Sequence, residues 1–315
     1  MMASRTTRIR RILTTVVLAP LAAVPAVASD FSTGGTFLPL GHGARAHALG
    51  GAGVALIRDD SAVYWNPANI AWASTRNGLT FMHAEILPSV NDAYNTLSYG
   101  RAVGPRLGEP SQVQRPTRWG VGIFFSHMGF DFESGKTWSE NVILVGGSYA
   151  VTNYASVGIG FKVLRALNDF DTANATGAGF DLGLTVVVFE NLTASLVGRD
   201  VWTRVSWDTS KWETLAPAVT LGFEYRPVRR WAAVGDFILR ESAIQRGAAG
   251  LEWQAFRDLL WLRAGATVVI PGGSRTYPSA GIGLSYRSFF LDYAASFDEE
   301  SALETGHRAS LRVQF

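Results

Sequence analysis

Residues 177–188 read GAGFDLGLTVVV, and the even-numbered positions from Ala178 to Val188 are all apolar. The odd-numbered positions up to 185 hold glycine, Asp181 or Thr185 instead. Successive side chains of a β-strand point to opposite faces, so an apolar period of two predicts a strand with one apolar face. The other face is rich in glycine and poor in charge, which is typical of the lumen side of a membrane β-barrel.

The same alternation recurs from Gly78 to Phe315 and predicts an all-β chain. Most of these segments are close to the roughly 9–11 residues that a tilted strand needs to cross a bilayer. We therefore predict a transmembrane antiparallel β-barrel of about fourteen strands, an even number as in bacterial outer-membrane barrels. The expected strands are 78–86, 94–103, 118–126, 140–151, 154–166, 176–189, 192–200, 216–226, 231–240, 246–255, 259–270, 277–287, 289–297 and 307–315.

The connections between the predicted strands alternate in length from the fourth strand on. Thr152-Asn153 and Glu190-Asn191 are short, whereas 167–175 and 201–215 are long. Transmembrane barrels have tight periplasmic turns and longer outer loops, so we expect the short connections to face the periplasm. The connection 104–117 is the exception, because it is long and falls on the periplasmic side. Later in the chain 227–230, 256–258 and 288 are short, and 241–245, 271–276 and 298–306 are longer.

The first 28 residues predict a cleaved signal peptide, and hence Sec-type export. A basic start at 5–11 precedes an apolar stretch at 12–27 that two prolines interrupt, and Ala26-Val27-Ala28 offers small residues to a signal peptidase. We expect residues 29–76 to form an N-terminal hatch or plug segment and 77–315 to form the barrel. The terminal Phe315 is typical of outer-membrane barrels, which indicates the outer membrane of a Gram-negative-type bacterium.

The composition fits a chain whose surface lies largely in lipid. Charged residues make up 17% of the sequence, against about 25% in an ordinary soluble domain. A soluble β-sandwich or a lipocalin-like barrel is the alternative, but either would turn more polar faces to water. A formal charge of +2 gives no support to a nucleic-acid partner, and the absence of cysteine excludes disulfides.

Residues 29–76 show no strand alternation. Glycines cluster at 41–53, and one of residues 59–61 can cap a short helix that ends near Trp65. Asn66-Pro67 suits the start of a second helical turn, with asparagine as the cap and proline at the first helical position. A compact element before the first strand has two possible positions, inside the lumen or in the periplasm.

Four motifs in this segment carry a family resemblance. They are Gly43-Ala44-Arg45-Ala46, Leu49-Gly50-Gly51-Ala52, Asp59-Asp60-Ser61-Ala62 and Tyr64-Trp65-Asn66-Pro67-Ala68. In this order they resemble the opening of PorV/PorQ-type outer-membrane proteins. They are also similar, more distantly, to the FadL-type transporters of long-chain fatty acids and aromatic hydrocarbons. Beyond about residues 41–72 the resemblance is one of architecture.

The resemblance implies two alternative functions. A PorV/PorQ-type barrel serves protein export, as a subunit or shuttle of a type IX-like secretion system with secretion proteins or exported cargo as partners. A FadL-type barrel is a passive channel for hydrophobic small molecules, and its N-terminal segment folds into the barrel as a hatch. The hatch residues so implied are Gly50, Gly51, Asp59, Asp60, Asn66 and Pro67. These residue types equally suit turns and caps that touch no ligand.

The alternation also turns a set of charged residues toward the lumen, where opposite charges can pair. We expect Asp59 and Asp60 to meet inward arginines there, such as Arg263, Arg287 or Arg308. The predicted lumen charges are Lys162, Asp181, Glu224, Arg226, Asp236, Arg263, Arg287, Asp292, Arg308 and Arg312, with Arg240 and Glu252 beside them.

Signals of catalysis are weak. The histidines show no metal-ligand spacing beyond the pair His42 and His47, and no nucleophile elbow is present. The glycine pairs of the strands, such as Gly158 and Gly160, lack the following helix of a phosphate loop. We expect no catalytic residues, no metal and no cofactor, and outer-membrane lipid as the main partner.

Overall fold

The computed structural model of the protein describes residues 40–85, 91–108, 115–131, 135–169, 174–209, 211–241, 243–256, 258–270, 274–297 and 306–315. The predicted signal peptide lies outside these residues. In the described part of the chain, no helix is long and apolar enough to cross a membrane.

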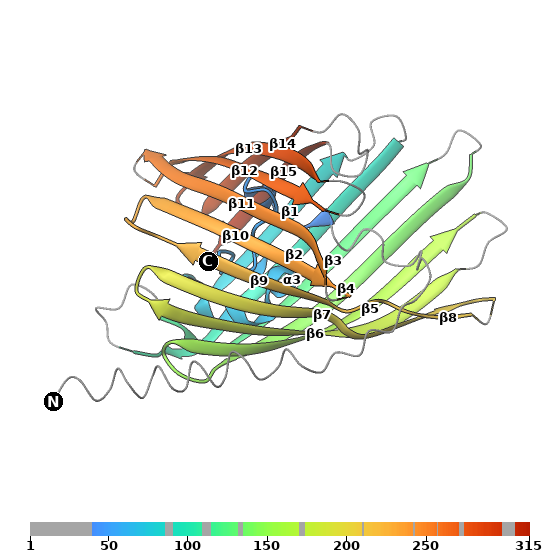
Figure 1. The fold of residues 1–315 in the computed structure, drawn as a ribbon, viewed down its shortest axis with the longest axis horizontal. Helices are drawn as coiled ribbons and strands as arrows, with labels where there is room; N and C mark the ends of the chain where they lie inside the picture. Colours follow the sequence, from blue (N-terminus) through green and yellow to red (C-terminus); the bar gives the residue numbers. More distant parts are fainter. Residues whose placement is uncertain are drawn as a thin grey trace.

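Fourteen of the described strands close into one antiparallel barrel (Figure 1). Each strand pairs with its neighbours in the chain, and β1 pairs with β15 to close the ring. A short strand, β8 (Trp212–Thr214), pairs with the last part of β7. The fourteen are β1 (Asn77–Glu85), β2 (Asn91–Arg106), β3 (Thr117–Asp131), β4 (Thr137–Ala150), β5 (Ala155–Asn168), β6 (Ala175–Phe189), β7 (Leu192–Trp207), β9 (Ala218–Tyr225), β10 (Trp231–Arg240), β11 (Ala243–Phe256), β12 (Leu260–Val269), β13 (Arg275–Tyr286), β14 (Phe289–Ser296) and β15 (Gly306–Gln314).

The predicted fourteen-strand barrel is confirmed, and most strand bounds agree within a few residues. The largest difference is β7, which runs on from the predicted end at residue 200 to Trp207. Asp200 has a φ of 53°, and the pairing of β6 with β7 shifts register between Phe180 and Leu182. Such a bulge reverses the alternation of faces, which hides the second half of the strand from a period-two pattern.

A second difference concerns the connection 241–245, which we expected to be long. β10 ends at Arg240 and β11 already begins at Ala243, so the two strands form a tight hairpin. Glu241 adopts a φ of 52° at this turn. The prediction of a longer loop here is wrong, because Ala243 to Gln245 lie in the strand.

The apolar faces of the strands point outward, as predicted. Leu182 on β6 is 47% exposed and Ile159 on β5 is 52% exposed, whereas Asp181 and Ser156, on the opposite faces of the same two strands, are buried. An outer surface of large apolar side chains is stable in hydrocarbon and unfavourable in water. The inner surface is polar and meets the N-terminal segment.

The two ends of the barrel differ. One end, here called the short-turn rim, carries the connections 151–154, 190–191 and 287–288. The opposite end, the long-loop rim, carries the connection 208–217, which contains β8. The first strand starts and the last strand ends at the short-turn rim, where Asn77 pairs with Phe315 through both backbone groups.

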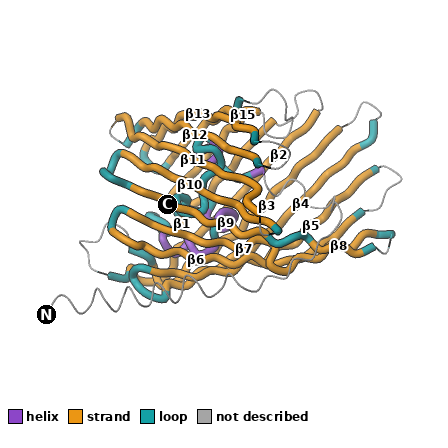
Figure 2. Tube along the Cα trace, in the orientation of Figure 1, coloured by secondary structure: helices purple, strands orange, loops and turns teal. Residues whose placement is uncertain are grey.

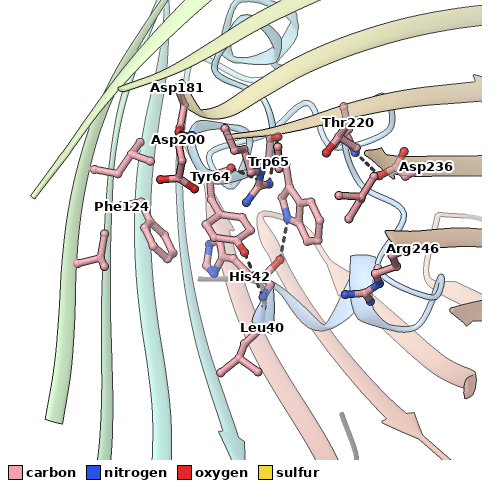
Figure 3. A pocket seen from close by; sticks show the side chains of 18 of the residues that line it. Leu40, His42, Tyr64, Trp65, Phe124, Asp181, Asp200, Thr220, Asp236 and Arg246 are labelled. Atoms are coloured by element: carbon pink, nitrogen blue, oxygen red, sulfur yellow. Dashed lines mark hydrogen bonds between the residues drawn. The ribbon is translucent and has the colours of Figure 1, made fainter. Parts of the chain in front are cut away.

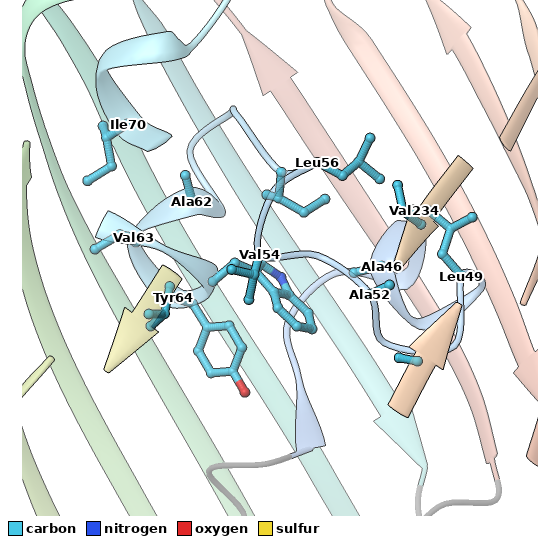
Figure 4. Packing of buried hydrophobic residues seen from close by; sticks show 14 of the residues in the cluster. Ala46, Leu49, Ala52, Val54, Leu56, Ala62, Val63, Tyr64, Ile70 and Val234 are labelled. Carbon is cyan, nitrogen blue, oxygen red and sulfur yellow. The ribbon is translucent and has the colours of Figure 1, made fainter. Parts of the chain in front are cut away.

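Residues 40–76, here called the N-terminal segment, contribute the helical turns α2 (Ala44–His47), α3 (Ala62–Trp65) and η3 (Pro67–Trp72) (Figure 2). These turns pack against inward faces of the strands, η3 against β3 to β6 and α2 against β13 to β15. Figure 4 shows the apolar cluster that joins them to the wall, which includes Leu49, Val54 and Tyr64 of the segment and Val234 of β10. The core of this molecule is therefore the contact between the segment and the barrel wall.

Candidate functional site

Asn66 and Pro67 form the turn between α3 and η3, in the roles expected for a cap and a first helical residue. The Asn66 side-chain oxygen accepts a hydrogen bond from the backbone N–H of Ala68 at 3.0 Å, and its Nδ2 donates to Oγ1 of Thr185 on β6 at 2.9 Å. Thr185 in turn donates to Oδ1 of Asn69 at 2.5 Å. Amide and hydroxyl groups thus attach this turn to β6. The sequence analysis did not single out Asn69, because this residue lies just outside the Asn66-Pro67-Ala68 motif on which the resemblance rests.

Gly50 and Gly51 lie where the segment meets β12. Their φ angles are 71° and 78°, a region that residues with a side chain rarely adopt. A Cβ on Gly50 would be 2.3 Å from the carbonyl oxygen of Ala266, and a Cβ on Gly265 would be 2.3 Å from the carbonyl carbon of Leu49. The two backbones approach this closely only because both positions are glycine.

Asp59 forms an ion pair with Arg312 of β15, and its Oδ1 accepts from the backbone N–H of Ser61 at 2.9 Å. The expected contact with an inward arginine is therefore present, but the arginine is none of the three that we named as examples, Arg263, Arg287 and Arg308. Sequence alternation places Arg312 and Arg308 on the same inward face of β15. Which of the two pairs with Asp59 depends on where the segment lies along the barrel axis, and the alternation does not give that position.

Asp60 is buried beside the start of β1 and the later part of β2. Its Oδ2 accepts a hydrogen bond from Oγ of Ser98 at 2.9 Å, and its Cα lies 2.6 Å from the position of a Cβ on Gly100. Burial, reinforced by the charge of Asp59, raises the pKa of the Asp60 carboxyl to about 7. No arginine was found as a hydrogen-bonding partner of Asp60 in the described residues, contrary to expectation.

Two carboxylates of the wall hold arginines of the segment. Glu252 on β11 pairs with Arg45 at 2.7 Å and with Arg263 of β12 at 2.8 Å. Arg263 extends this chain to Asp292 of β14 at 2.6 Å. Buried pairs of this kind are costly to break on one side, by about 3–5 kcal/mol, because an uncompensated charge remains.

The second such carboxylate is Glu224 on β9, which pairs with Arg58 of the segment and with Arg226. On the other side of the barrel, Lys162 lies 2.7 Å from both Asp181 and Asp200, the residue at the bulge of β7. Arg226 also lies 3.9 Å from Glu252, so the charges around Glu252 and Glu224 form one network, which includes two arginines of the segment. The Lys162 cluster lies apart from this network.

The remaining predicted lumen charges bind the backbone of the segment or lie elsewhere. Oδ2 of Asp236 accepts from the N–H groups of Gly53 and Val54, at 2.8 and 3.1 Å, and Arg308 donates to the carbonyl of Leu40. The prediction for Arg287 is wrong: it lies in the turn after β13 with a φ of 55° and is exposed. Because β13 ends at Tyr286, the alternation that placed Arg287 in the lumen does not extend to it.

A cavity of about 320 Å³ lies between the N-terminal segment and the long-loop half of the barrel (Figure 3). Tyr64, Trp65, Phe124 and Leu144 form an aromatic and aliphatic side of it. The rings of Tyr64 and Phe124 are 5.0 Å apart between centroids. Cavities of about 300–1,000 Å³ with mostly apolar linings are the usual binding sites of small molecules.

Charged side chains also line the cavity: Lys162 and Asp181 lie next to Leu144, whose register partner is Lys162, and Asp236 and Arg246 lie on the opposite side. Between the two sides, the guanidinium of Arg199 lies 4.7 Å from the ring centroid of Tyr64 and donates to the Tyr64 carbonyl at 3.2 Å. Neither Arg199 nor Phe124 was singled out from the sequence. Arg199 directly precedes the bulge, so its direction could not be derived from alternation.

The histidine pair of the segment is not arranged as a metal site. His42 hydrogen-bonds through Nδ1 to Thr96 at 2.7 Å and through Nε2 to Ser98 at 2.8 Å. Burial lowers the pKa of His42 to about 4, so its ring is neutral at pH 7. Among the residues that the structure describes, no group of three histidine or acidic side chains is placed to hold a metal ion.

Solved structures of outer-membrane transporters share this architecture. The toluene transporter TbuX of Ralstonia pickettii matches with a TM-score of 0.62 and 11% identity, over 89% of this chain and 100% of that chain. The toluene transporter TodX of Pseudomonas putida matches with a TM-score of 0.60 and 15% identity, over 88% and 99%. A FadL homologue of Pseudomonas aeruginosa matches with a TM-score of 0.60 and 12% identity, over 86% and 98%.

The chain has a FadL-type barrel fold. At these identities the likeness concerns the fold alone. No protein-family model matches the sequence, and no curated protein matches it. The comparisons thus agree with the distant FadL-type resemblance of the sequence, whereas nothing in them supports the PorV/PorQ resemblance or a role in protein export.

Proposed function

We propose that this protein is an outer-membrane channel for the passive entry of hydrophobic small molecules, with the N-terminal segment as its hatch. The observation that carries the proposal is the cavity beside the segment, with Tyr64, Trp65 and Phe124 in its lining. It lies on the long-loop side, so a molecule that enters from that side meets this apolar surface before it meets the rest of the segment. The FadL-type fold supports the same function, since its solved examples include toluene transporters.

In this proposal residues 40–76 are the hatch and 77–315 the channel wall; residues 29–39 of the predicted plug lie outside the described residues. Glu252, Glu224 and Asp236 hold the hatch through Arg45, Arg58 and the backbone of residues 53–54. Glu252 and Glu224 are linked through Arg226, whereas Asp236 is a distinct attachment, so the hatch can detach from one and stay attached at the other. An apolar molecule that binds against Tyr64 and Trp65 would contact α3, and α3 is therefore the part of the hatch that it would displace.

The proposal is tested by narrowing the cavity. Leu144 lines it on β4, and the next residue, Val145, is 51% exposed on the lipid-facing side. In host cells without hydrophobe channels of their own, the natural protein should speed the uptake of labelled toluene. Leu144→Trp should lower that uptake several-fold because the indole occupies the cavity, and Val145→Trp should leave it unchanged.

Both variants must show the heat-dependent gel mobility of a folded barrel. Uptake that is no faster with the natural protein than without it, for toluene and for a panel of larger neutral hydrocarbons, would refute the proposed function. Equal uptake by Leu144→Trp and the natural protein would show that molecules do not pass through this cavity.

A further inference from the structure

Five arginines gather in one sector of the short-turn rim. Arg76 precedes β1, Arg101 and Arg106 lie on the last part of β2, and Arg115 and Arg118 lie at the start of β3. We call this group the arginine rim. In the described residues none of the ion pairs involves these five side chains.

Within the part of the chain that the structure describes, the side-chain hydrogen bonds of the arginine rim go to carbonyl groups and do not compensate its charge. Arg106 donates to the carbonyls of Ala73 and Ser74, at 2.8 and 2.6 Å, and to the carbonyl of Arg115 at 2.7 Å, which brings it next to another arginine of the rim. Like charges within one cluster repel one another unless an anion lies between them. The cluster therefore has the electrostatic character of an anion site.

The arginine rim is continuous with the lipid-facing surface. Arg101 is exposed on the outward face of β2, where it pairs in register with Val121, and Val103 pairs with Trp119. Val121 and Trp119 are themselves exposed apolar residues of the outer face. In a membrane, an arginine side chain on this face lies in the layer of lipid headgroups and not in the surrounding water.

Aromatic residues beside the arginine rim mark the same level. The rings of Trp119 and Tyr149 are 4.5 Å apart, and the guanidinium of Arg118 lies 5.7 Å from the Tyr149 centroid. Tryptophan and tyrosine concentrate at the boundary between hydrocarbon and headgroups. In that boundary the anions within reach of a guanidinium are lipid phosphates, which arginine binds with two parallel hydrogen bonds.

We propose that the arginine rim binds the phosphate groups of anionic phospholipids in the leaflet at the short turns. This lipid contact requires that the barrel spans a membrane, and it does not depend on the proposed channel function. It makes the β1–β3 sector, where the N-terminal segment joins the barrel, a site of preferred lipid contact.

The test uses the full mature protein in detergent with phosphatidylglycerol, and native mass spectrometry to count retained lipid. Arg76 and Arg101 are exposed and make no side-chain hydrogen bond that shapes the fold among the described residues. Arg76→Gln with Arg101→Gln should lower phosphatidylglycerol retention by about fivefold per removed charge. The matched control is Arg165→Gln with Arg204→Gln, which removes two exposed arginines near the long-loop rim and should change retention less than twofold.

Four results would overturn the proposal. If both double variants lose phosphatidylglycerol retention equally, lipid binding depends on total charge and not on the arginine rim. If neither loses retention, the arginine rim does not bind lipid. Displacement of phosphatidylglycerol by millimolar inorganic phosphate would identify a site for free phosphate, and displacement by a polyglutamate peptide would indicate an acidic protein partner. If the double variant fails to fold, Arg101→Gln alone provides the same comparison.

Discussion

Asp60 shows how a single buried side chain makes the attachment of the N-terminal segment depend on pH. Its pKa is raised to about 7 in the folded protein, chiefly by burial and then by the charge of Asp59. The folded state therefore binds more protons than the unfolded state between about pH 4 and pH 7, and the segment's attachment weakens as pH rises through this window.

The substitution Asp60→Asn tests this dependence, because asparagine keeps the shape and stays neutral. Limited proteolysis within residues 40–76 should become faster in the natural protein between pH 5 and pH 8, and the variant should lack this increase. His42, whose pKa is lowered to about 4 by burial, has the opposite dependence between about pH 4 and 6.5, but it contributes equally to both proteins. Identical pH profiles would show that Asp60 does not control the attachment.

For single residues, the sequence predicted which charged side chains face the lumen, but it did not predict which residues they pair with. Lys162, Asp181, Glu224 and Asp236 are buried on the inner side, as the alternation predicted. The pairing of Asp59 with Arg312 rather than Arg308 depends on how the segment sits against β15, and the segment has no periodicity from which to derive that. Arg287 was misplaced because the alternation was extended by one residue beyond the end of its strand.

Among the structural elements, β5 illustrates why the inner faces are rich in glycine. The sequence indicated only that these glycines face a lumen. A Cβ on Gly158 would be 2.3 Å from the backbone nitrogen of Ala68 and 2.4 Å from the carbonyl carbon of Pro67. The inward glycines thus make room for the backbone of η3. This contact could not be predicted from the strand sequence, because it involves a segment elsewhere in the chain.

Gly158→Ala should accordingly displace η3 from the wall, at a cost of about 1–3 kcal/mol for an overpacked contact. The control is Gly160→Ala on the same inward face, where a Cβ would be 3.6 Å from Leu144, an ordinary contact. A cysteine at Ala68 should react with a small thiol reagent faster in the Gly158→Ala background than in the Gly160→Ala background. Equal rates in the two would contradict the close packing of η3 against β5.

For the molecule as a whole, strand number and faces followed from the sequence, because each strand repeats the same alternation independently. Sidedness is an inference from connection lengths, and it remains a prediction. A cysteine at Asp208, in the connection 208–217, should be labelled in intact cells by a membrane-impermeant reagent. A cysteine at Asn191, in the turn between β6 and β7, should be labelled only after the outer membrane is opened. The reverse pattern would invert the orientation of the barrel.

The central claim is that the N-terminal segment closes an otherwise open barrel. It is tested most directly by the conductance of a protein that lacks residues 41–72, purified as a folded barrel and inserted in planar bilayers. The fourteen strands pair with one another and do not need the segment for their hydrogen bonds, so the barrel should persist. We predict a clearly higher conductance than that of the natural protein, because the volume that Leu49, Val54, Tyr64 and Ile70 fill becomes open to water. An unchanged conductance in a correctly folded deletion variant would contradict this account.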